Sequence, residues 1–183
     1  MASHRVLVAD PISEHGVTLL NDHPDITADF IPDLGSQPDK LLEIIGDYDA
    51  LIVRSQTKPN AAVIARASRL RAIGRAGVGV DNIDREAASA HGVIVMNTPT
   101  GNTVSTAEHA FALMLATARN IAPAHAGVLA GDFKNSRKAF SGIEMNGKRL
   151  AVIGMGRIGS EFVKRAQGFN MKVVAFDPFL TQA

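Results

Sequence analysis

Hydrophobic and polar positions follow two rhythms along this 183-residue chain. Short β-branched runs predict strands, whereas apolar residues spaced three or four positions apart predict helices. The predicted strands are Arg5–Ala9, Ile26–Ile31, Ala50–Arg54, Ala72–Arg75, Val93–Met96, Arg149–Ile153 and Lys172–Phe176. The helical stretches between the earlier strands are Ser13–Asn21, Asp39–Ile45, Ala61–Ala67 and Arg85–His91.

Strands separated by single helices indicate right-handed βαβ units and a parallel sheet. We therefore expect an α/β protein whose residues 1–100 form a flavodoxin-like, parallel-sheet substrate domain. Residues 101–183 are expected to hold an interdomain helix and the first βαβ unit of a Rossmann dinucleotide-binding domain. The segment 97–102, Asn-Thr-Pro-Thr-Gly-Asn, is rich in turn-forming residues and marks the joint between the two domains.

The segment Thr103–Asn120 breaks this rhythm, because apolar residues surround the axis of the helix that it predicts. A helix without a polar face has to be buried on several sides. We therefore expect a domain crossover or a subunit contact here, with a homodimer formed through the 103–120 region. The following stretch, Ala122–Gly142, contains Gly127, Gly131 and Gly142 and is interpreted as a helix end followed by a surface connection.

Composition narrows the class of protein. The charged share is 20% with a net charge of +1, and basic residues do not cluster, so we expect no nucleic-acid or membrane partner. The chain has no cysteine, which rules out disulfides and thiolate metal sites. We expect no metal site. The N-terminus shows no signal-peptide core and the longest apolar stretch is too short to span a bilayer, which favours a soluble, cytoplasmic protein.

The most informative motif is Gly154-Met155-Gly156-Arg157-Ile158-Gly159, which lies between a predicted strand and the predicted helix Ser160–Gln167. This G-x-G-x-x-G pattern inside a βαβ unit is typical of dinucleotide binding. Gly154 permits the tight turn, Gly156 lets the backbone approach a pyrophosphate, and Gly159 allows the helix to pack closely on the strand. The N–H groups at the helix N-terminus would face the phosphates.

The second strand of this unit ends at Asp177, an acidic residue about 20 positions after the glycines. Its carboxylate would accept hydrogen bonds from the adenosine ribose hydroxyls and would repel a 2′-phosphate. No Arg or Lys follows to bind such a phosphate. The sequence therefore predicts NAD rather than NADP as the cofactor.

Four further segments form an ordered set with the glycine motif. They are Val53-Arg54-Ser55, the run Gly74-Arg75-Ala76-Gly77-Val78-Gly79-Val80-Asp81-Asn82-Ile83-Asp84, Asn97-Thr98-Pro99, and Thr100-Gly101-Asn102-Thr103-Val104-Ser105-Thr106-Ala107-Glu108-His109. Together they resemble the D-2-hydroxyacid dehydrogenases along essentially the whole chain. The segment Asp10-Pro11-Ile12-Ser13-Glu14 and the run around Gly77 resemble the D-3-phosphoglycerate dehydrogenase branch most closely.

The resemblance implies a small-molecule substrate, a D-2-hydroxy acid, which is oxidised by hydride transfer to NAD. In such a family the backbone N–H groups of Gly77, Val78 and Gly79 would bind the substrate carboxylate, as a nest of amides can. The alternative is a plain strand-to-helix turn. Arg54, next to Ser55, and Arg75 resemble residues that hold the carboxylate and phosphate of phosphoglycerate, although each could instead form a surface salt bridge.

Asn102 resembles the asparagine that lies beside the substrate in this family. It could equally be the N-cap of the helix that follows, and the two roles are compatible.

The proton-transfer set that the resemblance implies, an Arg, a Glu and a His, would lie downstream of Asp177. We expect none of the six histidines present to replace it. His109 follows Glu108, but adjacent helical residues point in different directions. We therefore interpret the chain as a truncated member without catalytic residues, inactive by itself.

Two other functions stay open. One is a glyoxylate or hydroxypyruvate reductase of the same family, whose substrates lack the phosphate that Arg54 and Arg75 would bind. The other is a non-catalytic module that binds NAD or an organic anion.

Overall fold

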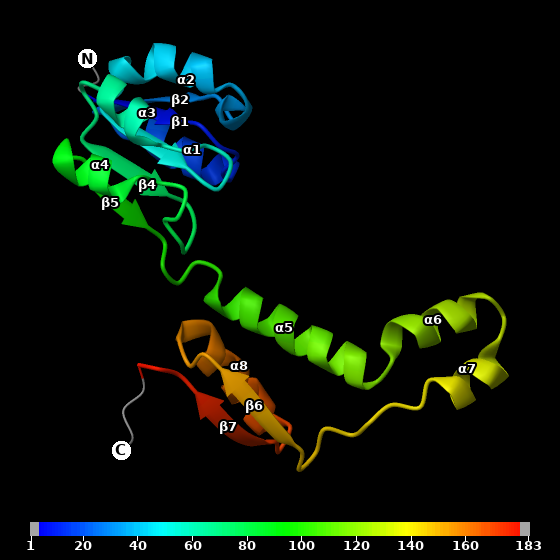
Figure 1. The fold of residues 1–183 in the computed structure, drawn as a ribbon. Coiled ribbons are helices and arrows are strands. Elements are labelled where there is room, and N and C mark those ends of the chain that lie inside the picture. Colours follow the sequence, from blue (N-terminus) through cyan, green and yellow to red (C-terminus); the bar gives the residue numbers. More distant parts are fainter. Residues whose placement is uncertain (1–3, 180–183) are drawn as a thin grey trace. The chain divides into compact units, whose positions relative to one another are not determined.

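A computed structural model describes residues 4–179 of the chain and divides it into two compact units, Met1–Gly101 and Asn102–Ala183. Figure 1 shows the first unit in blue to green and the second in green to red. Both units consist of helices and parallel strands, which confirms the predicted α/β class. None of the helices within residues 4–179 has the length and apolar character needed to cross a membrane.

The first unit is built on a five-stranded sheet in which every pair of neighbouring strands is parallel. The strands lie in the order β2-β1-β3-β4-β5, the doubly wound order of flavodoxin-like folds, which confirms that prediction. Their bounds are β1 His4–Val8, β2 Ile26–Phe30, β3 Ala50–Val53, β4 Ala72–Arg75 and β5 Ile94–Asn97. Because all the strands run the same way, their carboxyl ends meet at one edge, where such sheets bind ligands.

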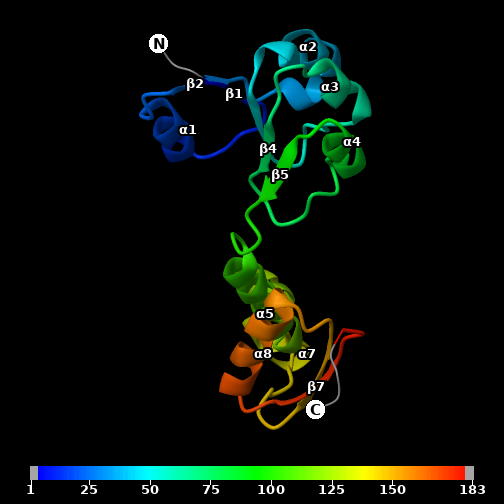
Figure 2. The same cartoon turned by 90° about the vertical axis from the view of Figure 1, so that its left-hand side faces the viewer.

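Four α-helices accompany this sheet: α1 Glu14–Asn21, α2 Pro38–Ile44, α3 Ala61–Arg66 and α4 Arg85–Ala90, with short 3₁₀ turns at Leu34–Ser36 and Ile45–Asp47. Figure 2 shows α2, α3 and α4 on one face and α1 on the other. The main core lies under the three helices, where Leu51 and Ile73 are fully buried against side chains such as Ile64. Ser13, Asn60 and Asp84 cap α1, α3 and α4.

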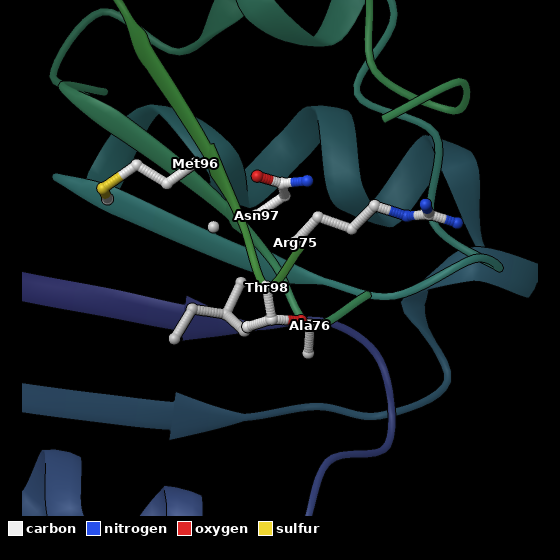
Figure 3. A pocket seen from close by; sticks show the side chains of 7 residues that line it. Arg75, Ala76, Met96, Asn97 and Thr98 are labelled. Atoms are coloured by element: carbon white, nitrogen blue, oxygen red, sulfur yellow. The ribbon is translucent and has the colours of Figure 1, made fainter. Parts of the chain in front are cut away.

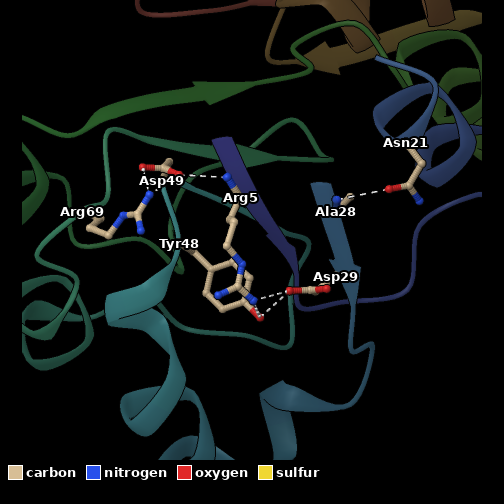
Figure 4. A network of polar contacts seen from close by, with 7 residues as sticks. All are labelled: Arg5, Asn21, Ala28, Asp29, Tyr48, Asp49 and Arg69. Carbon is tan, nitrogen blue, oxygen red and sulfur yellow. Dashed lines mark hydrogen bonds and ion pairs between the residues drawn. The ribbon is translucent and has the colours of Figure 1, made fainter. Parts of the chain in front are cut away.

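A polar network ties β1 and β2 to the residues that precede β3 (Figure 4). Asp29 on β2 accepts hydrogen bonds from Arg5 on β1 at 2.7 Å and from the Tyr48 hydroxyl at 2.8 Å. The Arg5 guanidinium also lies 4.6 Å from the centre of the Tyr48 ring. The hydrogen bond from Arg5 holds the pKa of Asp29 below its ordinary value, while burial, followed by the bond to Asp29, raises the pKa of Tyr48 to about 12.

Within residues 102–179, the second unit forms four helices and two parallel strands. Its elements are α5 Thr103–Ala118, α6 Ile121–Leu129, α7 Phe133–Ala139, β6 Arg149–Ile153, α8 Arg157–Gly168 and β7 Lys172–Phe176. The rings of Phe162 and Phe169 meet the Phe111 ring edge-on, at centroid distances of 5.6 and 5.0 Å. Arg165 of α8 adds an ion pair with Glu108 of α5 at 2.9 Å. These contacts pack α8 against α5.

The interpretation of Ala122–Gly142 as a helix end and a surface connection was wrong, because the structure forms the two helices α6 and α7 there. Pro123 lies in the first turn of α6, where its missing N–H costs no hydrogen bond. Gly131 follows the end of α6 in the left-handed region, at φ 77°. Gly127 faces Ser136, so that α7 can approach α6 closely. The glycines therefore shape a helical hairpin rather than a helix end and a surface connection.

The helix predicted at Thr103–Asn120 is present as α5, but its own chain covers only one face of it. Thr103, Ala107 and Phe111 are buried, while Val104 and Leu113 are 51% and 54% exposed. Residues 4–179 therefore do not bury this helix on several sides. Contact with another subunit stays a prediction.

Candidate functional site

The loop that follows β3 presents Arg54 and Ser55, which are both exposed. The buried Asp10, directly after β1, holds this loop: its carboxylate accepts the backbone N–H of Arg54 at 2.6 Å and of Gln56 at 3.2 Å. It also accepts the N–H of Thr57 at 3.1 Å and its hydroxyl at 2.6 Å. A carboxylate that accepts this many hydrogen bonds fixes the backbone from which Arg54 projects.

The sequence motifs did not point to this supporting role of Asp10. One signal in the sequence was its place directly after the apolar run Val6–Ala9, since an acidic residue there can bind the backbone of the next strand's loop.

The loop that follows β4 has its carbonyl groups bound to the protein. The carbonyl oxygen of Gly77 accepts the Thr98 N–H at 3.0 Å, that of Val78 accepts the Asn97 side-chain amide at 2.5 Å, and that of Gly79 accepts Arg75 Nη1. Of the three N–H groups predicted to bind a carboxylate, that of Gly77 donates to the Arg75 carbonyl oxygen at 2.9 Å, whereas those of Val78 and Gly79 have no acceptor within residues 4–179. This arrangement leaves two backbone donors at the carboxyl ends of the strands, as an anion-binding nest requires.

Arg75 is the last residue of β4, but its side chain is only 12% exposed. Nε donates to the Arg54 carbonyl oxygen at 3.0 Å, Nη1 donates to the Gly79 carbonyl oxygen, and Asp81 lies 3.5 Å from Nη1. The guanidinium therefore links the two loops. The predicted role of Arg75 as an anion ligand remains untested, and these bonds favour a supporting role.

A shallow pocket of about 210 Å³ lies at the ends of β3, β4 and β5 (Figure 3). Its lining residues are Ile52, Gly74, Arg75, Ala76, Met96, Asn97 and Thr98. Figure 3 shows Met96 and Arg75 pointing in opposite directions from the strand ends. A second hollow, of about 420 Å³, shares Ile52 and Ala76 with the first and is bordered by Arg54. The carboxyl edge of the sheet is therefore hollowed beside both loops.

Asn102 belongs to the second unit and occupies the N-cap position of α5. Its side chain makes no capping hydrogen bond, and only its backbone carbonyl oxygen is used, by Thr106 N–H at 2.9 Å and Ser105 Oγ at 3.2 Å. The alternative role as a side-chain cap is therefore not seen. Its role beside a substrate stays a prediction.

The glycine motif forms the turn between β6 and α8. Gly154 has φ 96°, a conformation that L side chains rarely adopt. A Cβ on Gly156 would meet no atom within 4 Å, whereas a Cβ on Gly159 would overlap the Gly154 carbonyl oxygen. Arg157 and Ile158 form the exposed first turn of α8, whose N–H groups have no intrahelical partner. Each glycine thus meets the steric requirement that the motif assigns to it.

Asp177 lies one residue after β7, and its carboxylate bonds to the glycine turn itself. Oδ2 accepts the Met155 N–H at 2.7 Å and Oδ1 accepts the Phe179 N–H at 2.9 Å. A carboxylate has about four acceptor positions, so capacity remains for two hydroxyl groups. These residues fit a dinucleotide: an open backbone at Gly156, free N–H groups at the start of α8 and an acid at the next strand end.

All six histidines of the chain are exposed, and none forms a hydrogen bond to a carboxylate within residues 4–179. Glu108 pairs with Arg165 rather than with its neighbour His109. No group of three or more acidic or histidine side chains in this part of the chain could hold a metal ion. The described residues therefore offer binding groups and no positioned base.

Comparison with known proteins places these features in a family. Residues 6–181 match the model of the D-isomer specific 2-hydroxyacid dehydrogenase catalytic domain. The D-3-phosphoglycerate dehydrogenase of Archaeoglobus fulgidus is 47% identical over 178 residues, which are 97% of this chain and 33% of that protein.

Two solved structures share the fold. The TT0316 protein from Thermus thermophilus matches with a TM-score of 0.85 and 32% identity, over 93% of this chain and 55% of that one. An NAD-dependent formate dehydrogenase from Staphylococcus aureus, solved in complex with NAD, matches with a TM-score of 0.81 and 26% identity, over 96% of this chain and 56% of that one. The chain thus spans about a third of the curated relative and about half of each solved chain.

Proposed function

The chain belongs to the D-isomer specific 2-hydroxyacid dehydrogenases, and we propose that it serves the NAD-dependent oxidation of D-3-phosphoglycerate to 3-phosphohydroxypyruvate, a step of serine biosynthesis. One observation carries the choice of substrate. Two groups suited to binding anions support it, at neighbouring strand ends of one unit: the exposed Arg54 after β3, whose Nη1 donates to the Pro11 carbonyl oxygen at 3.2 Å, and the free N–H groups of Val78 and Gly79 after β4. A substrate with a carboxylate and a phosphate uses both groups, whereas glyoxylate or hydroxypyruvate uses one.

The proposed binding groups form two sets, one for the carboxylate end of such a substrate and one for its phosphate end. The N–H groups of Val78 and Gly79 match a carboxylate in size and charge, since two parallel amides can bind its oxygens. The Arg54 guanidinium, with the Ser55 hydroxyl beside it, suits the forked oxygens of a phosphate.

NAD is the cofactor that the second unit fits. When bound, it accepts the hydride removed from the substrate carbon. Gly154, Gly156 and Gly159 leave the backbone open to the pyrophosphate, and the α8 N-terminus with Arg157 and Ile158 faces it. The Asp177 carboxylate binds ribose hydroxyls and excludes a 2′-phosphate.

Removal of the hydroxyl proton needs a base, and the exposed histidines of residues 4–179, none of which is hydrogen-bonded to a carboxylate, do not supply one. We therefore propose that the 183-residue chain binds substrate and NAD but does not turn over by itself. General acid–base help contributes roughly 10²–10⁴-fold to such reactions. Without it the rate of NADH formation stays at background.

We also propose that a second copy of the chain covers the exposed apolar residues of the second unit. Leu113 of α5, Leu129 of α6 and Phe133 of α7 are 54%, 74% and 60% exposed. Exposed apolar side chains gathered on adjoining helices are typical of protein interfaces. Sedimentation velocity measures the assembly, and a monomer at all concentrations contradicts it.

Isothermal titration calorimetry with D-3-phosphoglycerate, D-glycerate, NADH and NADPH tests the proposed function. We expect D-3-phosphoglycerate to bind more tightly than D-glycerate, and NADH more tightly than NADPH. Arg54→Ala should weaken D-3-phosphoglycerate about 10- to 100-fold, because charge-assisted hydrogen bonds contribute about 1.5–3 kcal/mol. Arg71→Ala is the matched control, since Arg71 is equally exposed but lies before the amino end of β4.

Equal binding of D-3-phosphoglycerate and D-glycerate would favour the glyoxylate or hydroxypyruvate reductases instead. Tighter binding of NADPH contradicts the role of Asp177. Turnover by the chain alone contradicts the absence of a positioned base.

A further inference from the structure

The two anion-binding loops of the first unit are joined at one atom, the carbonyl oxygen of Arg54. This oxygen accepts a hydrogen bond from Arg75 Nε at 3.0 Å and a second one from Asn82 Nδ2 at 2.9 Å. Arg75 and Asn82 flank the Gly77–Gly79 loop in the sequence. Both ends of the segment that carries the free amides are therefore bonded to the backbone of the residue that carries the exposed guanidinium.

Asn82 makes the more informative of these contacts. Its side-chain amide donates one hydrogen to the Arg54 carbonyl oxygen and the other to the Thr57 carbonyl oxygen, at 2.7 Å. The amide thus closes the loop Arg54–Thr57 from one side, while the Asp10 carboxylate binds the N–H groups of the same loop. The N–H groups of this loop thus donate to the Asp10 carboxylate, and its carbonyl oxygens accept from the Asn82 amide.

The other polar atom of the Asn82 side chain, its oxygen, does not stabilise the side chain in this position. Its Oδ1 is buried and has no hydrogen-bond partner among residues 4–179. A buried acceptor without a partner is unfavourable for folding. The two hydrogen bonds from Nδ2 are therefore what this residue provides, and both of them end on the loop of Arg54.

We propose that Asn82 is a positioning residue that sets the separation between the Arg54–Thr57 loop and the amides of Val78 and Gly79, and so selects substrates with two anionic groups over substrates with one. The inference rests on the proposed function, in which each loop binds one of the two anions. A ligand with a single anion uses one loop and does not depend on the separation. A ligand with two anions depends on it, because both ends have to be met at once.

The test is isothermal titration of the 183-residue chain with D-3-phosphoglycerate, D-glycerate and inorganic phosphate. Asn82→Asp keeps the shape but places a carboxylate oxygen against two carbonyl oxygens. We expect the preference for D-3-phosphoglycerate over D-glycerate to fall about tenfold, the loss of about one charge-assisted hydrogen bond. In the uncharged Asn82→Ala variant, the affinities for D-glycerate and for phosphate should each change less than about twofold, since each loop keeps its own donors.

Two further variants make the result specific. Asn82→Ala removes the donors without adding charge, and it carries the test if the Asp variant does not fold. Asn60→Asp is the matched control, because Asn60 caps α3 through its side-chain oxygen and Asp can make the same bond. We expect Asn60→Asp to leave all three affinities unchanged. The inference is overturned if the Asn82 variants weaken both organic ligands by the same factor, or leave their ratio as it was.

Failure of the proposed function is visible in the unsubstituted chain, as equal binding of D-3-phosphoglycerate and D-glycerate or as no binding. The positioning role is then decided by amide hydrogen exchange. Exchange at Arg54, Gln56 and Thr57 should be faster in both Asn82 variants than in the unsubstituted chain. Unchanged exchange at these amides overturns the inference.

Discussion

Both units of the chain are built from helices and parallel strands, but they differ in how far the apolar side chains of their strands are buried. In the first unit, Leu7, Leu51 and Ile73 on three neighbouring strands are fully buried. In the second unit, Ile153 at the end of β6 is 87% exposed and Phe176 at the end of β7 is 66% exposed. All five are apolar residues in parallel strands, which normally lie buried between layers. The difference teaches that an apolar strand pattern predicts the strand but not the cover over it.

The largest effect should come from removing an apolar strand side chain in each unit. Leu51→Ala should lower the free energy of unfolding of the first unit by about 2–5 kcal/mol, because it leaves a cavity in a closed core. Ile153→Ala should change the stability of the second unit by less than about 0.5 kcal/mol, since its side chain already contacts solvent. Urea denaturation followed by circular dichroism measures both.

These two variants test whether the strands of the second unit are exposed in solution. If Ile153→Ala costs as much as Leu51→Ala, the β6 side chain is covered in solution by another chain. Repeating the titration over a range of protein concentrations then identifies that cover, because an intermolecular contact makes stability concentration-dependent.

A second contrast lies within the glycine motif of the second unit. Gly159→Ala should destabilise this unit by about 1–3 kcal/mol, because the added methyl group overlaps a backbone oxygen that cannot rotate away. Gly156→Ala should leave stability within about 0.5 kcal/mol, since the methyl group enters open space and φ is −67°. Gly156→Ala should instead weaken NADH about tenfold, by keeping the backbone away from the pyrophosphate.

Thermal unfolding and NADH titration separate the two effects. The roles assigned to these glycines are wrong if Gly156→Ala unfolds the unit, or if Gly159→Ala changes neither stability nor affinity. In the first unit the matching position is Gly79, where an added Cβ would meet the ends of the Asp81 and Arg75 side chains. Such ends can move, so the loop after β4 should tolerate alanine better than Gly159 does.

The order and direction of the elements could be predicted from sequence because alternation and helical spacing report them directly. The helical hairpin at α6 and α7 could not be predicted in the same way. Pro and Gly occur both where helices break and within a first turn or just after a helix end, so the sequence does not tell which role Pro123 and Gly131 have. The burial of only one face of α5 could not be predicted either. Apolar residues all around a helix axis indicate that the helix is buried, but they do not indicate which chain buries it.

The candidate site was predicted as a set of positions, and the structure adds the bonds between them. Motif spacing located Arg54 and the Gly77–Gly79 loop at strand ends. It did not indicate that the Arg75 side chain is turned inward, to the carbonyl oxygens of Arg54 and Gly79. The supporting roles of Asp10 and Asn82 depend on contacts 44 and 28 residues apart in the chain, which local patterns do not report.

The smallest of the predicted effects concerns Tyr48, the only tyrosine in a chain without tryptophan, so that its titration can be followed alone by near-ultraviolet absorbance. Its pKa is raised to about 12, by burial first and by the bond to Asp29 second. The unfolded chain titrates near pH 10. Because the folded pKa is the higher one, the stabilising contribution is complete below about pH 10 and is lost as pH rises towards 12.

The expected loss over this range is on the order of 1 kcal/mol and confined to the first unit, since the second contains no tyrosine. Asp29→Asn should lower the pKa of Tyr48 only part of the way, because burial is the larger cause. Tyr48→Phe should remove this share of the pH dependence altogether. A Tyr48 that titrates near pH 10 in the folded chain would show that the network of Arg5, Asp29 and Tyr48 is accessible to solvent. The contrast between a well-buried first unit and a more exposed second unit would then not extend to this network.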